Sequence, residues 1–91
     1  MKNELLTIFN TYGKSHQVSK LLEEVGELIE TIMNEDKENM VQEIADVMVL
    51  LEQFKNYYGI SSEEITRIFW SKVYRQLDRI EKEEENVKDK R

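Results

Sequence analysis

Two pairs of acidic residues, each at a helical spacing, constrain the fold of this chain more than any other feature of its sequence. Glu24 and Glu27 are three residues apart, and Glu43 and Asp46 repeat that separation after an interval of fifteen residues. Residues three apart on an α-helix project from the same side of it. Two such helices packed side by side would therefore bring four carboxylates to one place.

A cluster of four ionised carboxylates repels itself unless a positive ion lies among them. Oxygen ligands suit a hard cation, and Mg²⁺ fits best, with Mn²⁺ able to replace it. The chain has no cysteine, and its only histidine is His16. These counts disfavour a thiolate zinc site and a histidine-rich di-iron site. The sequence therefore predicts a magnesium site between two helices.

The remaining sequence favours an all-α fold. The 91 residues include no proline and only three glycines, a composition typical of helical soluble proteins. We expect Gly13 to end the first helix in the left-handed conformation and Ser15 to cap the second. Asp36 is the expected N-cap of the third helix, and Gly59 its C-terminal stop. The apolar periodicity predicts one short and three longer helices, over residues 3–12, 16–33, 37–58 and 62–84.

The same periodicity predicts which side chains lie inside. In the second helix the acids occupy a flank separate from the apolar stripe, and residues 47–51 are apolar on every side, as in a helix buried between neighbours. A chain of this length is near the lower limit for a core of its own. We therefore expect a helical bundle completed by association into a homodimer or homotetramer. The expected inward side chains are Leu5, Leu6, Phe9 and Tyr12 in the first helix, Val18, Leu21, Leu22, Val25, Ile29 and Ile32 in the second, and Phe69, Trp70, Val73, Leu77 and Ile80 in the fourth.

Charge narrows the classes of partner. The formal net charge of −6 argues against binding to nucleic acid polymers and to anionic membranes, whose phosphates would be repelled. The sequence has no apolar run long enough to span a bilayer and no signal-peptide pattern, so we expect a cytoplasmic protein. One domain over residues 1–91 is predicted, with a charged end, about 82–91, that frays.

The acidic segments resemble a known family signature. Residues 20–28 read Lys-Leu-Leu-Glu-Glu-Val-Gly-Glu-Leu, and residues 43–46 read Glu-Ile-Ala-Asp. Together they are similar to the Glu-Glu-x-x-Glu, spacer, Glu-x-x-Asp motif of the MazG-like, all-α nucleoside triphosphate pyrophosphohydrolases. Residues 12–13, Tyr-Gly, and Gln17 also resemble short members of that family. The resemblance covers roughly residues 12–80.

This resemblance implies a reaction and the residues that perform it. The reaction is Mg²⁺-dependent hydrolysis of a nucleoside triphosphate to a monophosphate and pyrophosphate, with removal of unwanted nucleotides as a possible role. Glu23 is implied as an accessory acid, and Glu23 or Glu27 as the acceptor of the water's proton. The implied catalytic acids are Glu23, Glu24 and Glu27, and the implied metal ligands are Glu24, Glu27, Glu43 and Asp46.

Basic residues near the C-terminus are candidates for holding the phosphates. Lys72, Arg75 and Arg79 share one side of the fourth predicted helix, and a solvated charged face is the alternative interpretation. Lys20 is a weaker candidate for the same role. Where the family often has an Arg-Asn pair and a closing aromatic-Pro, this chain has Gln76 in place of Asn and lacks the aromatic-Pro.

Two other functions are compatible with the same acidic residues. Phosphoribosyl-ATP pyrophosphohydrolases carry similar acidic motifs, but here Val47-Met48-Val49 follows Asp46 in place of their Tyr-His. A non-catalytic helical interaction protein would use the same acids in surface ion pairs. A real metal site would raise the melting temperature on addition of Mg²⁺ or Mn²⁺, whereas surface ion pairs would not.

Overall fold

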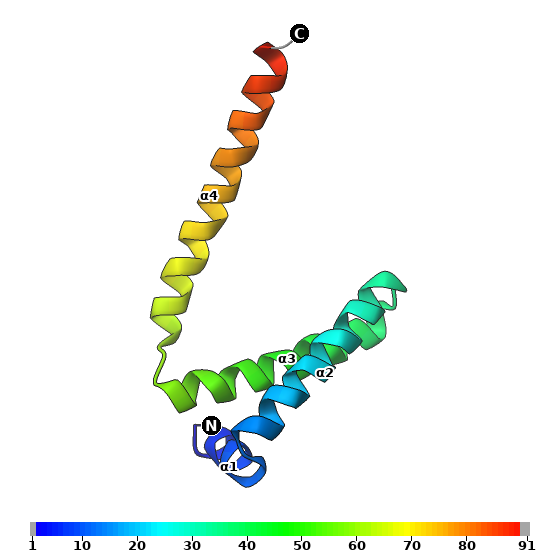
Figure 1. Cartoon of the computed structure of the whole chain (residues 1–91), viewed down its shortest axis with the longest axis vertical. Coiled ribbons are helices and arrows are strands. Elements are labelled where there is room, and N and C mark those ends of the chain that lie inside the picture. The colour runs from blue at the N-terminus through cyan, green and yellow to red at the C-terminus, as the bar shows by residue number, and fades with distance from the viewer. Residues whose placement is uncertain (1, 90–91) are drawn as a thin grey trace. The chain divides into compact units, whose positions relative to one another are not determined.

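The computed structural model describes residues 2–89, with side chains for residues 4–85, and contains four α-helices. They are α1 (Lys2–Tyr12), α2 (Lys14–Met33), α3 (Lys37–Tyr58) and α4 (Ser62–Asp89) (Figure 1). The predicted all-α fold of one short and three longer helices is confirmed. The charged end predicted to fray is helical as far as Asp89, and residues 90 and 91 lie outside the described part. None of these four helices is both long and apolar enough to cross a membrane.

The chain divides into two units, Met1–Gly59 and Ile60–Arg91. The first unit contains α1, α2 and α3, and the second contains α4 alone. A single domain over residues 1–91 stays a prediction.

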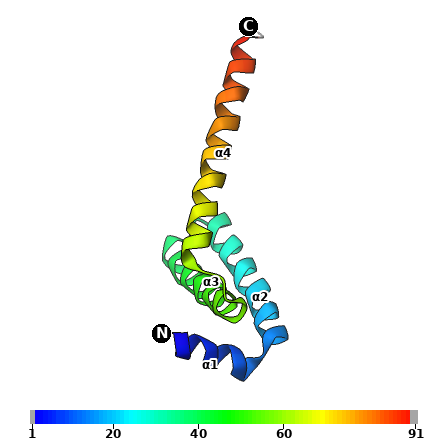
Figure 2. The same ribbon diagram turned by 90° about the vertical axis from the view of Figure 1, so that its left-hand side faces the viewer.

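Within the first unit, α2 and α3 lie side by side and α1 packs against both (Figures 1 and 2). Phe9 of α1 fixes this arrangement because its ring is almost completely buried. The ring meets Phe54 edge-to-face at 5.3 Å between centroids and stacks on Tyr57 at 4.5 Å. Such aromatic pairs add about 0.5–1.5 kcal/mol each beyond the area they bury. They attach α1 to the C-terminal half of α3.

The turns agree with the sequence at two of four predicted capping positions. Asp36 caps α3 by accepting a hydrogen bond from the backbone nitrogen of Asn39 at 3.2 Å, as predicted. Gly59 ends α3 in the left-handed conformation, with φ 65°, also as predicted. Gly13 has a positive φ of 88°, but its ψ of 157° is extended rather than left-handed helical. This sharp turn starts α2 at once, so Ser15 lies inside the helix and its predicted capping role is wrong.

The two fully buried side chains of α2 are polar, contrary to the predicted sidedness. Gln17 and Glu24 are only 3% and 6% exposed, whereas Leu22 of the expected apolar stripe is 77% exposed. Burying polar side chains is tolerated when hydrogen bonds or ion pairs satisfy them, and both are present at this interface. Of the predicted stripe, Leu21 and Val25 are half-buried, and the prediction of burial fails for the other four members within a single chain. These four exposed members are Val18, Leu22, Ile29 and Ile32.

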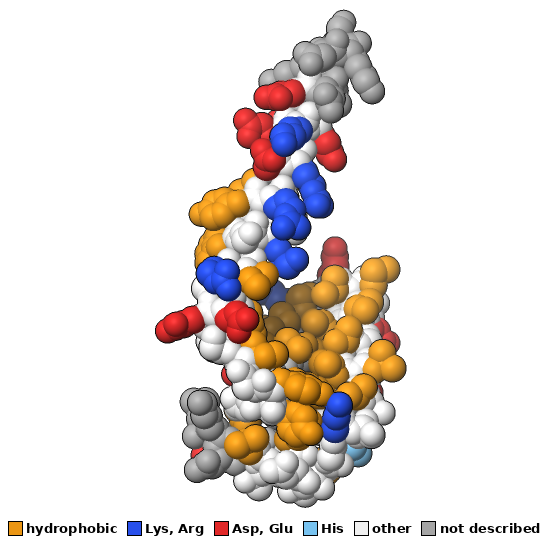
Figure 3. Space-filling view, turned by 60° about the vertical axis from the view of Figure 1, so that its left-hand side comes forward, with side chains coloured by type: hydrophobic (Ala, Val, Ile, Leu, Met, Phe, Trp, Pro, Cys, Tyr) orange, Lys and Arg blue, Asp and Glu red, His pale blue; other side chains and the backbone are white. Residues whose placement is uncertain are grey.

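Other expected core positions are also exposed within the chain. Tyr12 of α1 is exposed, and α3 is covered on one side only, so Leu50 is buried while Met48 and Leu51 are not. On α4 the predicted inward side chains Phe69, Trp70, Leu77 and Ile80 are exposed in the single chain, and Val73 is half-buried. A single helix has no second element of its own unit to cover an apolar stripe. Figure 3 shows hydrophobic side chains gathered on the visible face of the first unit and along α4.

Candidate functional site

Acids from α2 and α3 meet where the two helices pack. One carboxylate oxygen from each of Glu24, Glu43 and Asp46 lies within 4.8 Å of the other two. Glu24 is buried, Glu43 is half-buried and Asp46 is exposed. Glu43 and Asp46 project from the same side of α3 because they are three residues apart. The structure therefore places these three predicted ligands together at the helix interface.

A second acidic group lies on α2 alone. Carboxylate oxygens of Glu23, Glu24 and Glu27 also lie within 4.8 Å of one another, so Glu24 belongs to both groups. Glu27, a predicted ligand, is thus grouped with its neighbours on α2 rather than with Glu43 and Asp46. The five acids form two overlapping clusters that share one buried carboxylate.

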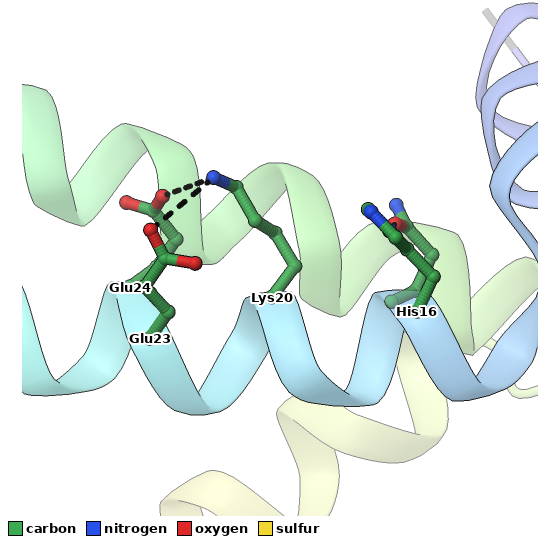
Figure 4. Close-up of polar contacts among 5 residues, drawn as sticks. His16, Lys20, Glu23 and Glu24 are labelled. Atoms are coloured by element: carbon green, nitrogen blue, oxygen red, sulfur yellow. Dashed lines mark hydrogen bonds and ion pairs between the residues drawn. The ribbon is translucent and has the colours of Figure 1, made fainter.

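Lys20 lies beside the shared carboxylate. Its Nζ is 3.3 Å from Glu24 Oε1 and 3.6 Å from Glu23 Oε1, and Figure 4 shows the side chain reaching both glutamates from one turn earlier on α2. The hydrogen bond to Glu24, with the charge of Glu23, raises the pKa of Lys20. Lys20 is therefore a partner of the acids, and its contact with a phosphate stays a prediction.

Two carboxylate oxygens at this interface have the environment of metal ligands. With both groups ionised, Glu24 Oε2 and Glu43 Oε2 are buried and find no hydrogen-bond donor among the described residues. A buried polar atom without a partner costs about 1–3 kcal/mol, and more when charged. An all-oxygen set with two such atoms fits a hard divalent cation of the Mg²⁺ or Mn²⁺ type.

Glu43 binds a proton more tightly than an ordinary glutamate does. A hydrogen bond to Glu24 raises the pKa of Glu43 to about 7. Burial and the negative charges of Glu27 and Asp46 act in the same direction. The same hydrogen bond lowers the pKa of Glu24, and the adjacent Lys20 ammonium adds to this effect, while burial opposes it. The proton is bound by Glu43 rather than by Glu24 because the Lys20 ammonium lies beside Glu24.

A cavity of about 500 Å³ adjoins the acids within the first unit. Glu24 and Asp46 border it at one end. About 12 Å earlier along α2, at 1.5 Å per residue, His16 borders it too. The Tyr12 ring stacks on the His16 ring at 4.9 Å between centroids. The complete lining is Tyr12, His16, Gln17, Lys20, Glu24, Asp46, Val49, Leu50 and Gln53.

Two side chains that line this cavity have no role predicted from the sequence. His16 is exposed in the first turn of α2, and Gln53 is 2% exposed. A usable signal was present in α2, because Gln17, Lys20 and Glu24 recur at helical spacing and form a polar stripe beside the apolar one. No comparable signal links Gln17 to Gln53, which are 36 residues apart in the chain.

The basic residues predicted to hold phosphates belong to the second unit. Lys72, Arg75 and Arg79 are all exposed on α4. Their role in binding stays a prediction.

A sequence model described as the MazG nucleotide pyrophosphohydrolase domain matches residues 13–85. The matched range contains the five acids, Lys20 and the three basic residues of α4. Comparisons with curated proteins and with solved structures gave no match.

Proposed function

The chain belongs to the MazG nucleotide pyrophosphohydrolase family, and on this basis we propose that it hydrolyses nucleoside triphosphates to a monophosphate and pyrophosphate. The family acts on nucleoside triphosphates with the help of a divalent metal ion. Mg²⁺ is the proposed ion, with Mn²⁺ as a substitute, and removal of unwanted nucleotides is the proposed role.

The observation that carries the proposal is the convergence of Glu24, Glu43 and Asp46 beside a cavity. Three carboxylates share one place, and when Glu24 and Glu43 are both ionised, one buried oxygen of each has no donor among the described residues. This arrangement is costly in a protein that only needs to fold. The same arrangement of carboxylates is useful in a protein that must hold a cation next to a triphosphate.

We assign the metal to Glu24, Glu43 and Asp46, with Glu27 as a further ligand from the adjoining cluster. A bound Mg²⁺ supplies neutralisation of the phosphate oxygens and polarisation of the attacking water.

The remaining residues position the substrate and move a proton. The water oxygen forms a bond to phosphorus, and the bond from phosphorus to the oxygen bridging the α and β phosphates breaks. Glu23 or Glu27 accepts the water's proton, since neither is as deeply buried as Glu24. Lys20 orients Glu24 through their ion pair and borders the cavity, where its ammonium is available to a phosphate oxygen. Lys72, Arg75 and Arg79 hold the phosphate tail.

The proposed active form is a homodimer or homotetramer. The apolar stripe of α2 and much of α3 are exposed in the single chain. Apolar faces of this extent are typical of surfaces that associate. A second copy of the chain supplies a matching face.

The first test is release of pyrophosphate from a panel of ribo- and deoxyribonucleoside triphosphates and phosphoribosyl-ATP, with Mg²⁺ or Mn²⁺. Loss of a residue that only supports a metal ligand already costs about 10–100-fold. We therefore expect Glu43→Gln and Asp46→Asn to lower kcat/KM by more than about 100-fold. The matched control is Glu81→Gln, an exposed acid of α4 in a second Glu-x-x-Glu pair with Glu84, which should retain wild-type activity.

The panel also separates the alternatives. Turnover of phosphoribosyl-ATP alone would assign the chain to that reaction. No release from any substrate, together with no rise in melting temperature on adding either ion, would favour a non-catalytic interaction protein.

A further inference from the structure

Two buried amides line the cavity about two helical turns from the acids, one on α2 and one on α3. Gln17 Nε2 donates a hydrogen bond of 2.8 Å to Gln53 Oε1. The two side chains are 3% and 2% exposed, yet both line the cavity. Burying two amides is unfavourable unless their polar atoms are used. A pair that served only to join α2 to α3 would need no access to a cavity.

His16 begins this hydrogen-bond chain. Its Nδ1 is 2.9 Å from Gln17 Oε1, an atom that can only accept, so in this orientation Nδ1 carries the hydrogen. The stacked Tyr12 ring holds the imidazole plane. Gln17 Nε2 then faces Gln53 Oε1, and turning over either amide alone loses a hydrogen bond. In the orientation that the structure shows, the direction runs from His16 through Gln17 to Gln53.

The chain ends in an unused donor. Among the residues whose side chains the structure describes, Gln53 Nε2 has no hydrogen-bond partner, and it belongs to a side chain that lines the cavity. An amide nitrogen donates and does not accept. The group that meets it must therefore offer an acceptor, and a group that offers an N–H at that position leaves a buried donor unsatisfied.

We propose that Gln53, oriented by Gln17 and His16, selects nucleotides whose base carries a carbonyl oxygen where others carry an amine, that is, 4-oxopyrimidines over 4-aminopyrimidines and 6-oxopurines over 6-aminopurines. This inference rests on the proposed function, because it takes a nucleotide as the occupant of the cavity. The acids at one end receive the phosphates, and the amides and the Tyr12–His16 stack receive the base.

The cleanest probes are two pairs of substrates that differ by replacement of an amine with a carbonyl. They are UTP with CTP, and ITP with ATP. For the wild type we expect kcat/KM at least about tenfold higher for the oxo member of each pair, the ratio for one hydrogen bond of about 1.4 kcal/mol. Equal values in both pairs would overturn the proposal.

Two isosteric variants should reverse the preference by different routes. In Gln53→Glu, one carboxylate oxygen accepts from Gln17 and the other presents an acceptor to the cavity. In Gln17→Glu, the new carboxylate accepts from His16 and requires Gln53 to turn and donate to it, which presents Gln53 Oε1 to the cavity. Both variants should favour CTP over UTP and ATP over ITP. The matched control is Gln42→Glu on the exposed side of α3, which should keep the wild-type ratios.

A purely structural role for the Gln17–Gln53 pair predicts a different effect of the two variants on kcat/KM. Both variants would then lower kcat/KM equally for all four nucleotides and leave the ratios unchanged, which would overturn the proposal. If the charged variants do not fold, as judged by circular dichroism melting, Gln53→Met replaces them. It should bring both ratios close to one, and an unchanged preference would overturn the proposal.

A binding experiment distinguishes failure of the proposed reaction from failure of the proposed base preference. Calorimetric binding of the non-hydrolysable α,β-methylene analogues of UTP and CTP measures the base preference without turnover. Tighter binding of the UTP analogue without pyrophosphate release would reject the reaction and support the base preference. Release of pyrophosphate with no preference in either substrate pair would reject the base preference and support the reaction.

Discussion

At the scale of single residues, the pKa values of the site follow from its excess of negative over positive charge. Lys20 neutralises part of the acidic cluster, and Glu43 takes up a proton in response to what remains. Glu24 is the most deeply buried member, and its pKa is lowered by the hydrogen bond with Glu43 and by the Lys20 ammonium beside it. The repulsion among the carboxylates proposed to bind the metal is therefore reduced by Lys20 and by the proton on Glu43.

The raised pKa of Glu43 predicts how the metal-free protein responds to pH. The folded state binds this proton more tightly than the unfolded chain does, since the pKa rises from 4.5 to about 7. The resulting stabilisation is complete below about pH 4.5 and is lost as the pH rises through about 7. In EDTA, Glu43→Gln should melt at a higher temperature than the wild type at pH 8, with a difference that shrinks towards pH 5.

The measurement is a series of melting curves from pH 5 to 8 for both proteins. Addition of Mg²⁺ at pH 8 should raise the wild-type melting temperature by mass action and raise that of the variant less. A constant difference between the two proteins across this pH range would contradict the raised pKa.

At the scale of the elements, the turn between α2 and α3 sets how the two acidic pairs meet. The Glu35 nitrogen donates to the Ile32 oxygen at 3.1 Å, and the Asp36 nitrogen to the Thr31 oxygen at 2.9 Å. Within this turn Glu35 has φ 54°, a left-handed conformation that a side chain makes costly. The turn is thus held by its neighbours against the preference of one residue.

Replacing Glu35 should stabilise the protein. The left-handed conformation costs a non-glycine residue about 1–2 kcal/mol, and glycine avoids this cost while losing more entropy on folding. We expect Glu35→Gly to raise the free energy of unfolding by about 0.5–1 kcal/mol, measured by urea denaturation at one protein concentration. The adjacent Asn34→Gly is the control. With φ −89° at Asn34 there is no strain to relieve, so that variant should be less stable than the wild type.

Helix positions could be read from the sequence, whereas helix sidedness could not. Asp36 and Gly59 mark the ends of α3 by local chemistry that acts within a few residues. The apolar stripe containing Leu22 indicates a face of α2 that packs against another surface. Its periodicity does not tell whether that surface belongs to the same chain or to a second copy. The pairing of Gln17 with Gln53 depends on helix packing, which the sequence pattern does not specify.

At the scale of the whole molecule, the first unit buries polar side chains of α2 and α3 beside Phe9 and Leu50, while many of its large apolar side chains lie outside. Polar atoms at the α2–α3 interface are joined by the Gln17–Gln53 hydrogen bond and the Lys20–Glu24 ion pair. Each contact is worth little net free energy compared with burial of large apolar side chains. The stability of such a unit is expected to depend on what covers its outer face.

A charge placed on the exposed apolar face of α2 should prevent association of the chain with a second copy. Leu22 is 77% exposed in the chain, so Leu22→Arg should have little effect on an isolated subunit. In an assembly, the same substitution buries an unpaired charge at a cost of several kcal/mol. Sedimentation at micromolar concentration should show a dimer or tetramer for the wild type and a smaller species for the variant.

Ser19→Arg, which adds the same charge to α2 away from the apolar stripe, is the control and should sediment as the wild type does. A monomeric wild type whose melting temperature does not change with protein concentration would contradict the proposed assembly.

The Lys20 ion pairs have a consequence for how the protein is made. Many small metalloproteins are unfolded until their ion arrives, because their ligands cannot be brought together without it. Here the chain carries its own monovalent counter-ion, tethered 3.3 Å from the most buried ligand. We therefore expect a newly synthesised chain to assemble its acidic site before it meets a divalent ion. If the proposed function holds, the abundance of that ion should set the activity of the protein rather than its survival.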